Sequence, residues 1–330
     1  MSNRLHNTLL KFKPYDYFIE WTKVVVLPGF GSLPLYTVAV FFFQEIARES
    51  LLNKAAALAY NFLLAIFPGV IFLFTLIPYI PVDNFQEQLL SFIALALPEN
   101  AYEVIQSTLE DIVINQNRGL LSFGFIAALF FSTNGLTSLM NAFNKASLIS
   151  ETRGWFRQRL VSIGLSFMVV VALAIGFTII TISSHIFTYI KSLMDIAESF
   201  WLNLIYVTRW FILAAVYLFT VSMVYKFGPA SSKRWKFFSP GATLATILAI
   251  LVFWGFAYYI NHFNAYNRLY GSIGTLIVIM IWLYLNSLIL LIGFELNAAI
   301  ELSKRSIKIV KPRFNSFKSD KPVEERYKRF

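Results

Sequence analysis

Residues 276–300 read LIVIMIWLYLNSLILLIGFELNAAI, and this stretch decides the class of fold. Its one charged side chain is Glu295, near the end of the stretch. With a rise of about 1.5 Å per residue, a helix of this length can cross the ~30 Å hydrocarbon core of a bilayer. A helix that is apolar on every side belongs in lipid or deep inside a large protein. The stretch therefore predicts a transmembrane helix.

Five further apolar runs precede this one, and the composition agrees with a membrane protein. The chain has 330 residues, of which 57% are hydrophobic and 14% charged, and its mean hydropathy is +0.63. Soluble domains carry about 25% charged residues. The predicted spans are 55–80, 119–144, 160–188, 203–225, 238–260 and 273–300. We therefore expect an all-α fold, a polytopic membrane helix bundle with about six transmembrane helices.

Two segments outside these runs are typical of amphipathic helices. Residues 35–52 mix aromatic and aliphatic side chains with Glu45, Arg48 and Glu49, which predicts an interfacial helix lying on the membrane. A seventh span is the alternative for this segment. Residues 83–118 are rich in acids and predict a helical segment between the first two spans, on the extracytoplasmic side. The chain then divides into an N-terminal segment (1–54), a six-helix membrane domain (55–303) and a basic tail (304–330).

The basic side chains fall almost entirely on one side of this predicted path. Of the 28 lysines and arginines, 24 lie on the side of the N-terminus and 4 on the other. The four are Arg118, Lys191, Arg209 and Arg268. The positive-inside rule then places both termini in the cytoplasm, which implies a multi-pass protein of a bacterial inner membrane. Because topology and anionic lipid headgroups account for the net charge of +10, we expect membrane lipids as partners and no nucleic acid. The oligomeric state is left open.

The second span carries a polar stripe, which includes Asn134, Ser138 and Asn141. Spacings of three and four residues place these side chains on one face of a helix. Two interpretations stay open. The stripe could hold neighbouring helices together by hydrogen bonds, at about 0.6–2 kcal/mol per contact, or it could form one wall of a polar cleft.

Two charged residues inside spans are further candidates for function. Arg209 lies in the outer third of the fourth span, where an arginine can snorkel to the headgroups or bind a lipid phosphate. Glu295 lies towards the cytoplasmic end of the sixth span. It is either one half of an ion pair or a carboxylate for proton coupling or gating. Lys54, Arg157 and Lys226 lie on the same side as candidate partners.

The outward turn between the fifth and sixth spans, residues 258–274, is dense in polar and aromatic groups. Tyr266 and Tyr270 are typical of residues at a membrane interface and could also contact a substrate. Gly271 and Gly274 would let the sixth helix begin close to another backbone.

Motifs for enzyme chemistry are scarce in this sequence. There are no cysteines, which excludes disulfides and thiolate sites. The three histidines lie far apart in the sequence. No metal-ligand spacing, nucleophile elbow or phosphate-binding loop is found. We therefore expect no metal, no cofactor and no catalytic residues.

Several short motifs occur in one order along residues 45–303. They are Ala55–Tyr60 with Phe67-Pro68, Leu139–Asn144, Pro240–Ala242, Tyr270–Gly274, Trp282–Leu285 and Gly293–Asn297. In this set the chain resembles the YihY/BrkB family of bacterial inner-membrane proteins. The resemblance implies six membrane helices, an inner-membrane location and motif positions at Tyr60, Pro68, Gly241, Gly271, Gly274 and Asn297. Asn61 and Ala65 depart from the family pattern.

The resemblance does not imply one activity, because family members have carried a ribonuclease name and are also described as transporters linked to envelope integrity. Ribonuclease activity is not expected, since RNA cleavage usually needs acids with a metal, or paired histidines. The leading hypothesis is a transporter or flippase-like protein for a lipid or amphiphile of the envelope. The polar stripe, Arg209 and the 258–274 turn would line the path, and Glu295 would form a cytoplasmic gate. A membrane scaffold that recruits a partner or anionic lipid is the alternative, and a membrane-embedded hydrolase comes third.

Overall fold

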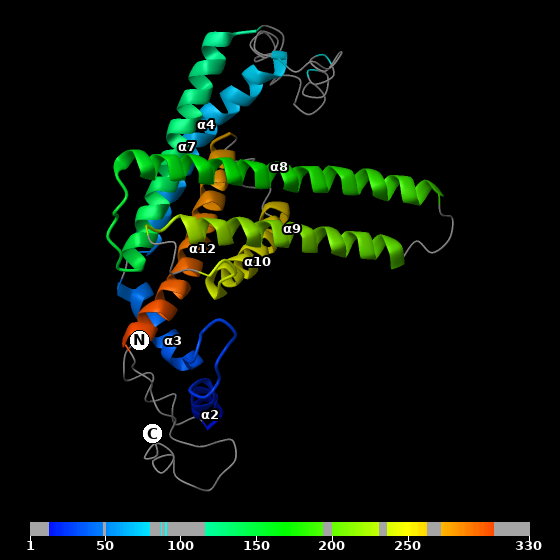
Figure 1. The fold of residues 1–330 in the computed structure, drawn as a ribbon. Coiled ribbons are helices and arrows are strands. Elements are labelled where there is room, and N and C mark those ends of the chain that lie inside the picture. Colours follow the sequence, from blue (N-terminus) through cyan, green and yellow to red (C-terminus); the bar gives the residue numbers. More distant parts are fainter. Residues whose placement is uncertain are drawn as a thin grey trace, which may run out of the picture.

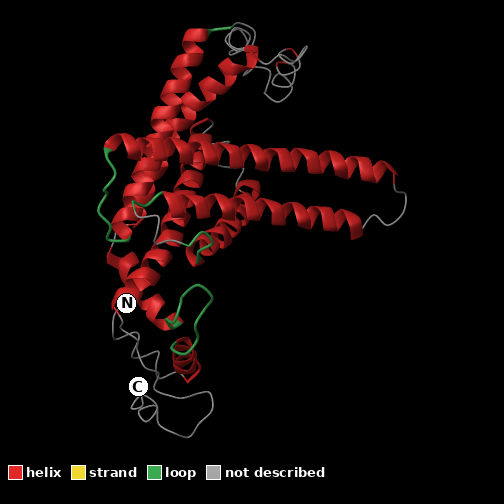
Figure 2. Cartoon of the chain, viewed as in Figure 1, coloured by secondary structure: helices red, strands yellow, loops and turns green. Residues whose placement is uncertain are grey.

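The computed structural model describes residues 13–48, 51–79, 87, 90, 116–193, 200–230, 236–262 and 272–306. Within these ranges every regular element is a helix (Figure 2). Six helices are long and apolar enough to cross a membrane, which confirms the predicted all-α polytopic bundle. They are α4 (Leu51–Leu76), α7 (Arg118–Ala146), α8 (Trp155–Leu193), α9 (Phe200–Phe227), α10 (Pro240–His262) and α12 (Ser272–Ser306).

The six helices form three hairpins, because α4 packs on α7, α8 on α9 and α10 on α12. Helix α12 also packs on α4 and α7, and it lies at the centre of the arrangement in Figure 1. The α4–α7 and α8–α9 hairpins leave this centre in different directions (Figure 1). We call the end where α4, α8 and α10 begin the converged end. The far tips of the hairpins, which lie apart from one another, are together called the splayed end.

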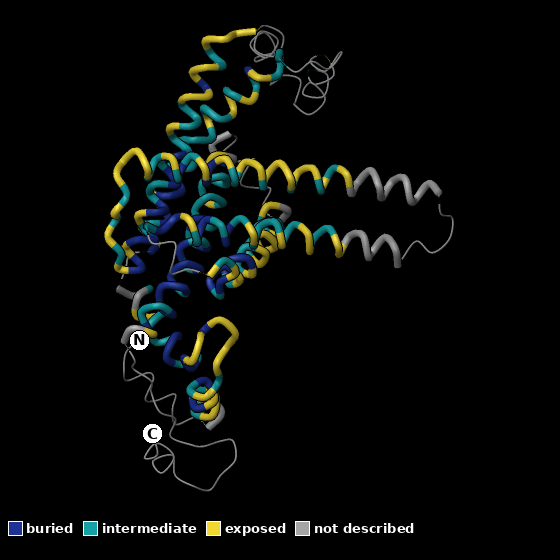
Figure 3. The backbone as a smooth tube through the Cα atoms, in the orientation of Figure 1, coloured by how far each residue is buried: buried dark blue, intermediate teal, exposed yellow. Residues whose placement is uncertain are grey.

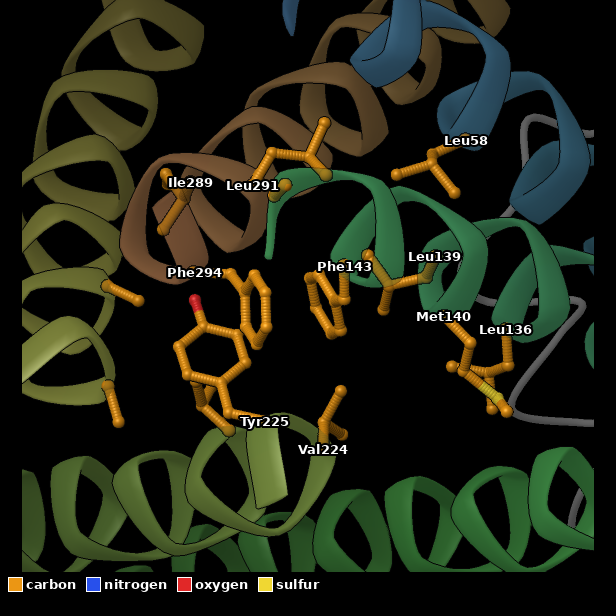
Figure 4. Packing of buried hydrophobic residues seen from close by; sticks show 14 of the residues in the cluster. Leu58, Leu136, Leu139, Met140, Phe143, Val224, Tyr225, Ile289, Leu291 and Phe294 are labelled. Carbon is orange, nitrogen blue, oxygen red and sulfur yellow. The ribbon is translucent and has the colours of Figure 1, made fainter. Parts of the chain in front are cut away.

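The buried core lies at the converged end (Figure 3). Its centre is an aromatic cluster of Phe143 from α7, Tyr225 from α9 and Phe294 from α12 (Figure 4). The rings of Phe143 and Phe294 stack at 4.0 Å, and Tyr225 meets Phe143 edge-on at 5.4 Å. The Tyr225 hydroxyl donates to the Leu290 carbonyl oxygen at 2.7 Å. Each hairpin therefore contributes one ring, and such pairs add about 0.5–1.5 kcal/mol beyond area burial.

Towards the splayed end the hairpins differ in how closely their helices pack. Helices α4 and α7 stay in contact through glycines: a Cβ on Gly124 would lie 3.0 Å from the Phe72 backbone nitrogen, and one on Gly135 would lie 2.8 Å from the Phe62 ring. Small residues allow this close approach between helices in membranes. Between α8 and α9 the contact is looser, since a Cβ on Gly176 would lie 3.7 Å from the Leu213 side chain, and Phe177 beside it is 72% exposed. An apolar side chain in that position suits contact with lipid.

Two helices precede the first span, α2 (Lys13–Thr22) and α3 (Leu35–Arg48). Helix α3 has 14 residues, so it is about 21 Å long and too short to cross a ~30 Å core as a straight helix. Its Val38 packs with Leu33 against Ile300 near the end of α12. This arrangement favours the interfacial position over a seventh span. The loop before α3 turns at Gly29, whose φ of +91° favours glycine and whose Cα faces Pro240.

The boundaries of some predicted spans shift in the structure. Helix α8 begins at Trp155 rather than at 160, and α12 continues to Ser306 rather than ending near 300. The predicted amphipathic segment 83–118 lies outside the described residues except for 87, 90 and 116–118. The tail beyond residue 306 lies outside them as well.

Candidate functional site

A seam of polar side chains joins α7 to α8, and it contains two of the predicted site residues. Arg159 donates from its Nη1 to the Asn134 Oδ1 at 2.6 Å, and its guanidinium lies 5.0 Å above the Phe130 ring. Gln158 donates to the Asn141 Oδ1 at 2.9 Å. We call this set of contacts the α7–α8 seam. An arginine that stacks on a ring and bonds an amide oxygen has its charge partly compensated within the bundle.

Hydroxyl pairs continue the α7–α8 seam towards the splayed end. Thr137 and Ser162 lie 2.9 Å apart at their side-chain oxygens, and Ser132 donates to Ser166 at 2.9 Å. The seam is therefore closed largely by side-chain hydrogen bonds.

Ser138, the remaining predicted residue of the polar stripe, faces α4 rather than α8. The Asn61 amide donates to its hydroxyl at 3.4 Å. Asn61 is one of the positions that departs from the family pattern, and here its side chain is used in a contact between helices. The stripe on α7 thus serves two neighbours, α8 through its asparagines and α4 through Ser138.

The loop between α7 and α8 is locked by a carboxylate network around Glu151. Arg153 donates from Nε to Oε1 and from Nη2 to Oε2, both at 2.8 Å, and Asn144 donates to Oε2 at 2.7 Å. The same Arg153 Nη2 donates to the Gly228 carbonyl oxygen at 2.8 Å, just beyond the end of α9. The paired guanidinium lowers the pKa of Glu151 below its ordinary value of 4.5. The network therefore ties the ends of α7 and α9 together.

Glu295 is buried, with 2% of its side chain exposed. On α12, Phe294 faces the aromatic cluster, Asn297 faces α10 and Ile300 faces α3. Successive residues step about 100° around a helix, so Glu295 lies on a different side of α12 from Asn297 and Ile300. Helix α4 also packs on α12. Lys54, near the start of α4, has a buried Nζ.

The other two candidate partners of Glu295 lie in different surroundings. Arg157 is exposed on the first turns of α8. The Lys226 ammonium lies over aromatic rings, 5.8 Å from the centre of Phe227 and 5.6 Å from that of Phe237. Of the three predicted partners, Lys54 is therefore the one that belongs to a helix packed closely on α12.

Arg209 borders a groove between α9, α10 and α12. Its guanidinium lies 5.8 Å above the ring of Trp210, which lines the groove. The volume is about 460 Å³, and exposed side chains such as Phe211 and Trp254 form its mouth. The lining is Val207, Trp210, Phe211, Leu213, Ala214, Tyr217, Thr246, Ala249, Ile250, Phe253, Trp254, Trp282 and Asn286. We call it the α9–α10–α12 groove.

Comparison with known proteins assigns the chain to a family. Residues 42–313 match the family described as Virulence factor BrkB. The chain belongs to the BrkB family. This confirms the resemblance inferred from the ordered motifs, and the chain is a multi-pass membrane protein.

Individual relatives are similar over most of this chain. It is 34% identical over 253 residues to the ribonuclease-like protein YfkH of Bacillus subtilis (strain 168), which covers 77% of this chain and 91% of that protein. It is 24% identical over 261 residues to the UPF0761 membrane protein Smlt0865 of Stenotrophomonas maltophilia (strain K279a), covering 79% of this chain and 60% of that protein. A UPF0761 membrane protein of Xanthomonas campestris pv. campestris (strain B100) is 25% identical over 266 residues, with the same coverage of 79% and 60%. The chain thus spans about three fifths of these UPF0761 relatives. No solved structure matches it.

The motif positions of this BrkB-family protein have separate structural settings. Asn297 accepts from the Gly241 backbone N–H at 2.8 Å and donates to the Ser239 hydroxyl at 2.8 Å, so it caps the start of α10 from α12. Pro68 lies inside α4, where Tyr60 is 56% exposed.

The predicted residues of the outward turn fall into two groups. Gly274 is buried near the start of α12. Tyr266, Tyr270 and Gly271 lie outside the described residues, so their place on a substrate path stays a prediction. Among the residues that the structure does describe, no group of three or more His, Cys, Asp or Glu side chains could hold a metal ion.

Sequence reasoning missed several residues that the structure brings into the seam. Arg159 and Gln158 lie before residue 160, where the third span was predicted to begin, so no contact with the second span was expected of them. The signal that could have found them is the run Trp155–Leu160, which already has helical spacing before the apolar residues begin. A helix that starts there aligns its first turns with the polar stripe of α7.

Proposed function

We propose that this BrkB-family protein is a transporter or flippase-like protein that moves a lipid or amphiphile of the envelope across the inner membrane. In this proposal the converged end faces the cytoplasm, as the distribution of basic residues predicts. The observation that supports it is the contrast between the two ends. The aromatic cluster closes the converged end, while the hairpins diverge at the other (Figure 3). A transporter that rocks one bundle against another has one closed side in each state.

The α7–α8 seam would act as the joint between the α4–α7 and α8–α9 hairpins. Side-chain hydrogen bonds between membrane helices contribute about 0.6–2 kcal/mol each, so a few can exchange during a rocking motion. Asn134 and Asn141 would then close the seam in this conformation and face the path when the hairpins separate. Both interpretations of the stripe are combined in this mechanism.

Glu295 would sense the proton gradient at the closed end. A buried carboxylate in a membrane protein typically marks an ion or proton pathway. Its protonation would alter the packing of α12 against α4 and so favour opening. We therefore expect transport to respond to a proton gradient, and we expect Glu295→Gln to remove this response while leaving the protein folded.

The test is transbilayer movement of labelled phospholipid and lipid A-like probes in proteoliposomes, with and without a proton gradient. Wild type should accelerate the movement of at least one probe, and Asn134→Leu should abolish the acceleration. Thr178→Val is the matched control, because Thr178 is exposed on α8 and bonds only within its own helix, to the Ala174 carbonyl oxygen at 2.8 Å. No acceleration of any probe by well-folded wild type would contradict transport and favour the scaffold.

A further inference from the structure

The α9–α10–α12 groove has the shape of a site for a chain rather than for a compact ligand. A second cavity of about 380 Å³ continues it towards the splayed end, and the two cavities share Phe253 and Trp282. On α10 the lining residues run from Thr246 to Ile260, a distance of about 21 Å along the helix. That length exceeds the hydrocarbon thickness of one leaflet, which is half of the ~30 Å core of a bilayer.

The walls of the groove are aromatic, and the rings brace one another. Phe253 meets Trp210 at 5.6 Å and Trp282 at 6.3 Å, while Phe256 lies 4.8 Å from Trp282. Rings fixed by such contacts form a stable apolar surface.

Apart from the Tyr217 hydroxyl, the side-chain polar groups at the inner end of the groove are bonded within their own helices. The Thr246 hydroxyl donates to the Ala242 carbonyl oxygen at 2.9 Å, and the Asn286 amide donates to the Trp282 carbonyl oxygen at 2.8 Å. Few polar groups at the inner end of the groove therefore need a hydrogen bond from a bound molecule. This favours hydrocarbon over a polar substrate.

A positive charge lies level with the junction of the two cavities. Arg209 lies over the ring of Trp210, and Trp210 meets Phe253, which lines both cavities, so the inner cavity extends from this level towards the converged end. Among the described residues that line the two cavities, none is an aspartate or glutamate. A planar guanidinium at that level matches the phosphate of a lipid whose chain lies in the groove.

We propose that the α9–α10–α12 groove binds one chain of an anionic phospholipid, with Arg209 contacting the phosphate. The inference rests on the proposed function in taking an envelope lipid as the ligand, and it names the site. Binding depends on the groove and on Arg209, and it needs no movement of the hairpins.

The test uses tryptophan fluorescence of the full-length protein in vesicles that contain lipids with dibrominated chains, which quench nearby indoles. Trp210, Trp254 and Trp282 line the groove, so bound chains should quench them. Phosphatidylglycerol should bind about fivefold more tightly than phosphatidylcholine in wild type, since a basic residue near the surface contributes about 1 kcal/mol towards an anionic lipid. Size-exclusion chromatography checks the folding of every variant.

Two variants and one control test whether the preference for phosphatidylglycerol depends on the groove and on Arg209. Ala214→Phe fills the groove and Arg209→Gln removes the charge. Each variant should bind phosphatidylglycerol and phosphatidylcholine with about equal affinity. Ala174→Phe, at an exposed position on α8, should keep the wild-type preference. Equal quenching by both lipids in wild type would overturn the proposal, as would a preference that survives both groove variants.

The same proteins in the translocation assay separate this inference from the proposed function. A groove-dependent preference without any translocation would support the site and contradict transport. Translocation by wild type without a lipid preference would leave transport standing and overturn the groove as its lipid site.

Discussion

Gly241 and Gly293 bring the backbones of α10 and α12 into direct contact at the converged end. A Cβ on Gly293 would lie 2.6 Å from the Gly241 carbonyl oxygen, and one on Gly241 would overlap the Gly293 carbonyl oxygen. The atoms in the way belong to the backbone, so side-chain motion cannot relieve the overlap. This pair sets how closely the last hairpin can close.

Gly241→Ala is therefore expected to destabilise the protein by about 1–3 kcal/mol, the usual cost of overpacking. Gly255→Ala is the matched control, because Gly255 lies on the same helix and its Cβ would meet nothing within 4 Å. The control should be neutral or slightly stabilising, since alanine is the better helix former. Thermal unfolding in detergent compares the two, and equal melting temperatures would contradict the prediction.

Asn297→Leu should cost about 1–3 kcal/mol, because it leaves the buried Gly241 N–H without an acceptor. Asn297→Asp keeps an acceptor for that group, but it buries a carboxylate where Asn297 is 4% exposed and loses the donor to the Ser239 hydroxyl, so it should also destabilise the protein. The measurement is again thermal unfolding, supported by hydrogen exchange at the start of α10. A leucine variant as stable as wild type would show that the cap contributes nothing.

The Arg159–Asn134 contact predicts energetic coupling between α7 and α8. A double-mutant cycle with Arg159→Gln and Asn134→Leu should give a coupling energy of about 0.5–1.7 kcal/mol. The same cycle with Arg157→Gln in place of Arg159→Gln should give none beyond experimental error, because Arg157 is exposed. Similar coupling in both cycles would mean that the effect comes from general charge rather than from the seam.

Stability should depend on pH through Glu151. Arg153 faces this carboxylate, with Asn144 and Gln158 as hydrogen-bond donors, and the folded pKa lies below the ordinary 4.5. The carboxylate's contribution to stability is therefore complete above about pH 4.5 and is lost as the pH falls through the folded pKa. The stability difference between wild type and Glu151→Gln should shrink over that window, which denaturant unfolding can measure. A difference that stays constant from about pH 7 to about pH 3 would argue against the network.

The six spans could be predicted from sequence because each is predominantly apolar over about 20 or more residues, the length that a helix needs to cross the hydrocarbon core. The partners of the polar residues could not be predicted. Arg159 lies just before the apolar part of its helix, so by sequence it belonged to the loop. Its contact with Asn134 depends on α8 starting at Trp155 and passing over α7.

Glu295 illustrates a second limit of sequence reasoning. In the sequence it lies towards the cytoplasmic end of the sixth span, with basic residues on the same side as candidate partners. In the structure it is buried, because α3 and α4 pack on that end of α12. Coverage by an N-terminal helix depends on contacts between segments about 250 residues apart, which periodicity within one span cannot show.

The contacts of α12 also have a consequence for biosynthesis. Chains are inserted from the N-terminus, so α3 leaves the ribosome before any of the six spans, whereas α12, which packs on Val38, is the last of those spans to be made. The early hairpins can pair as they emerge, but α3 and the buried side of α4 must wait for α12. A nascent chain that stops before residue 272 would present these apolar surfaces to chaperones and membrane proteases, so quality control can distinguish incomplete chains from finished ones.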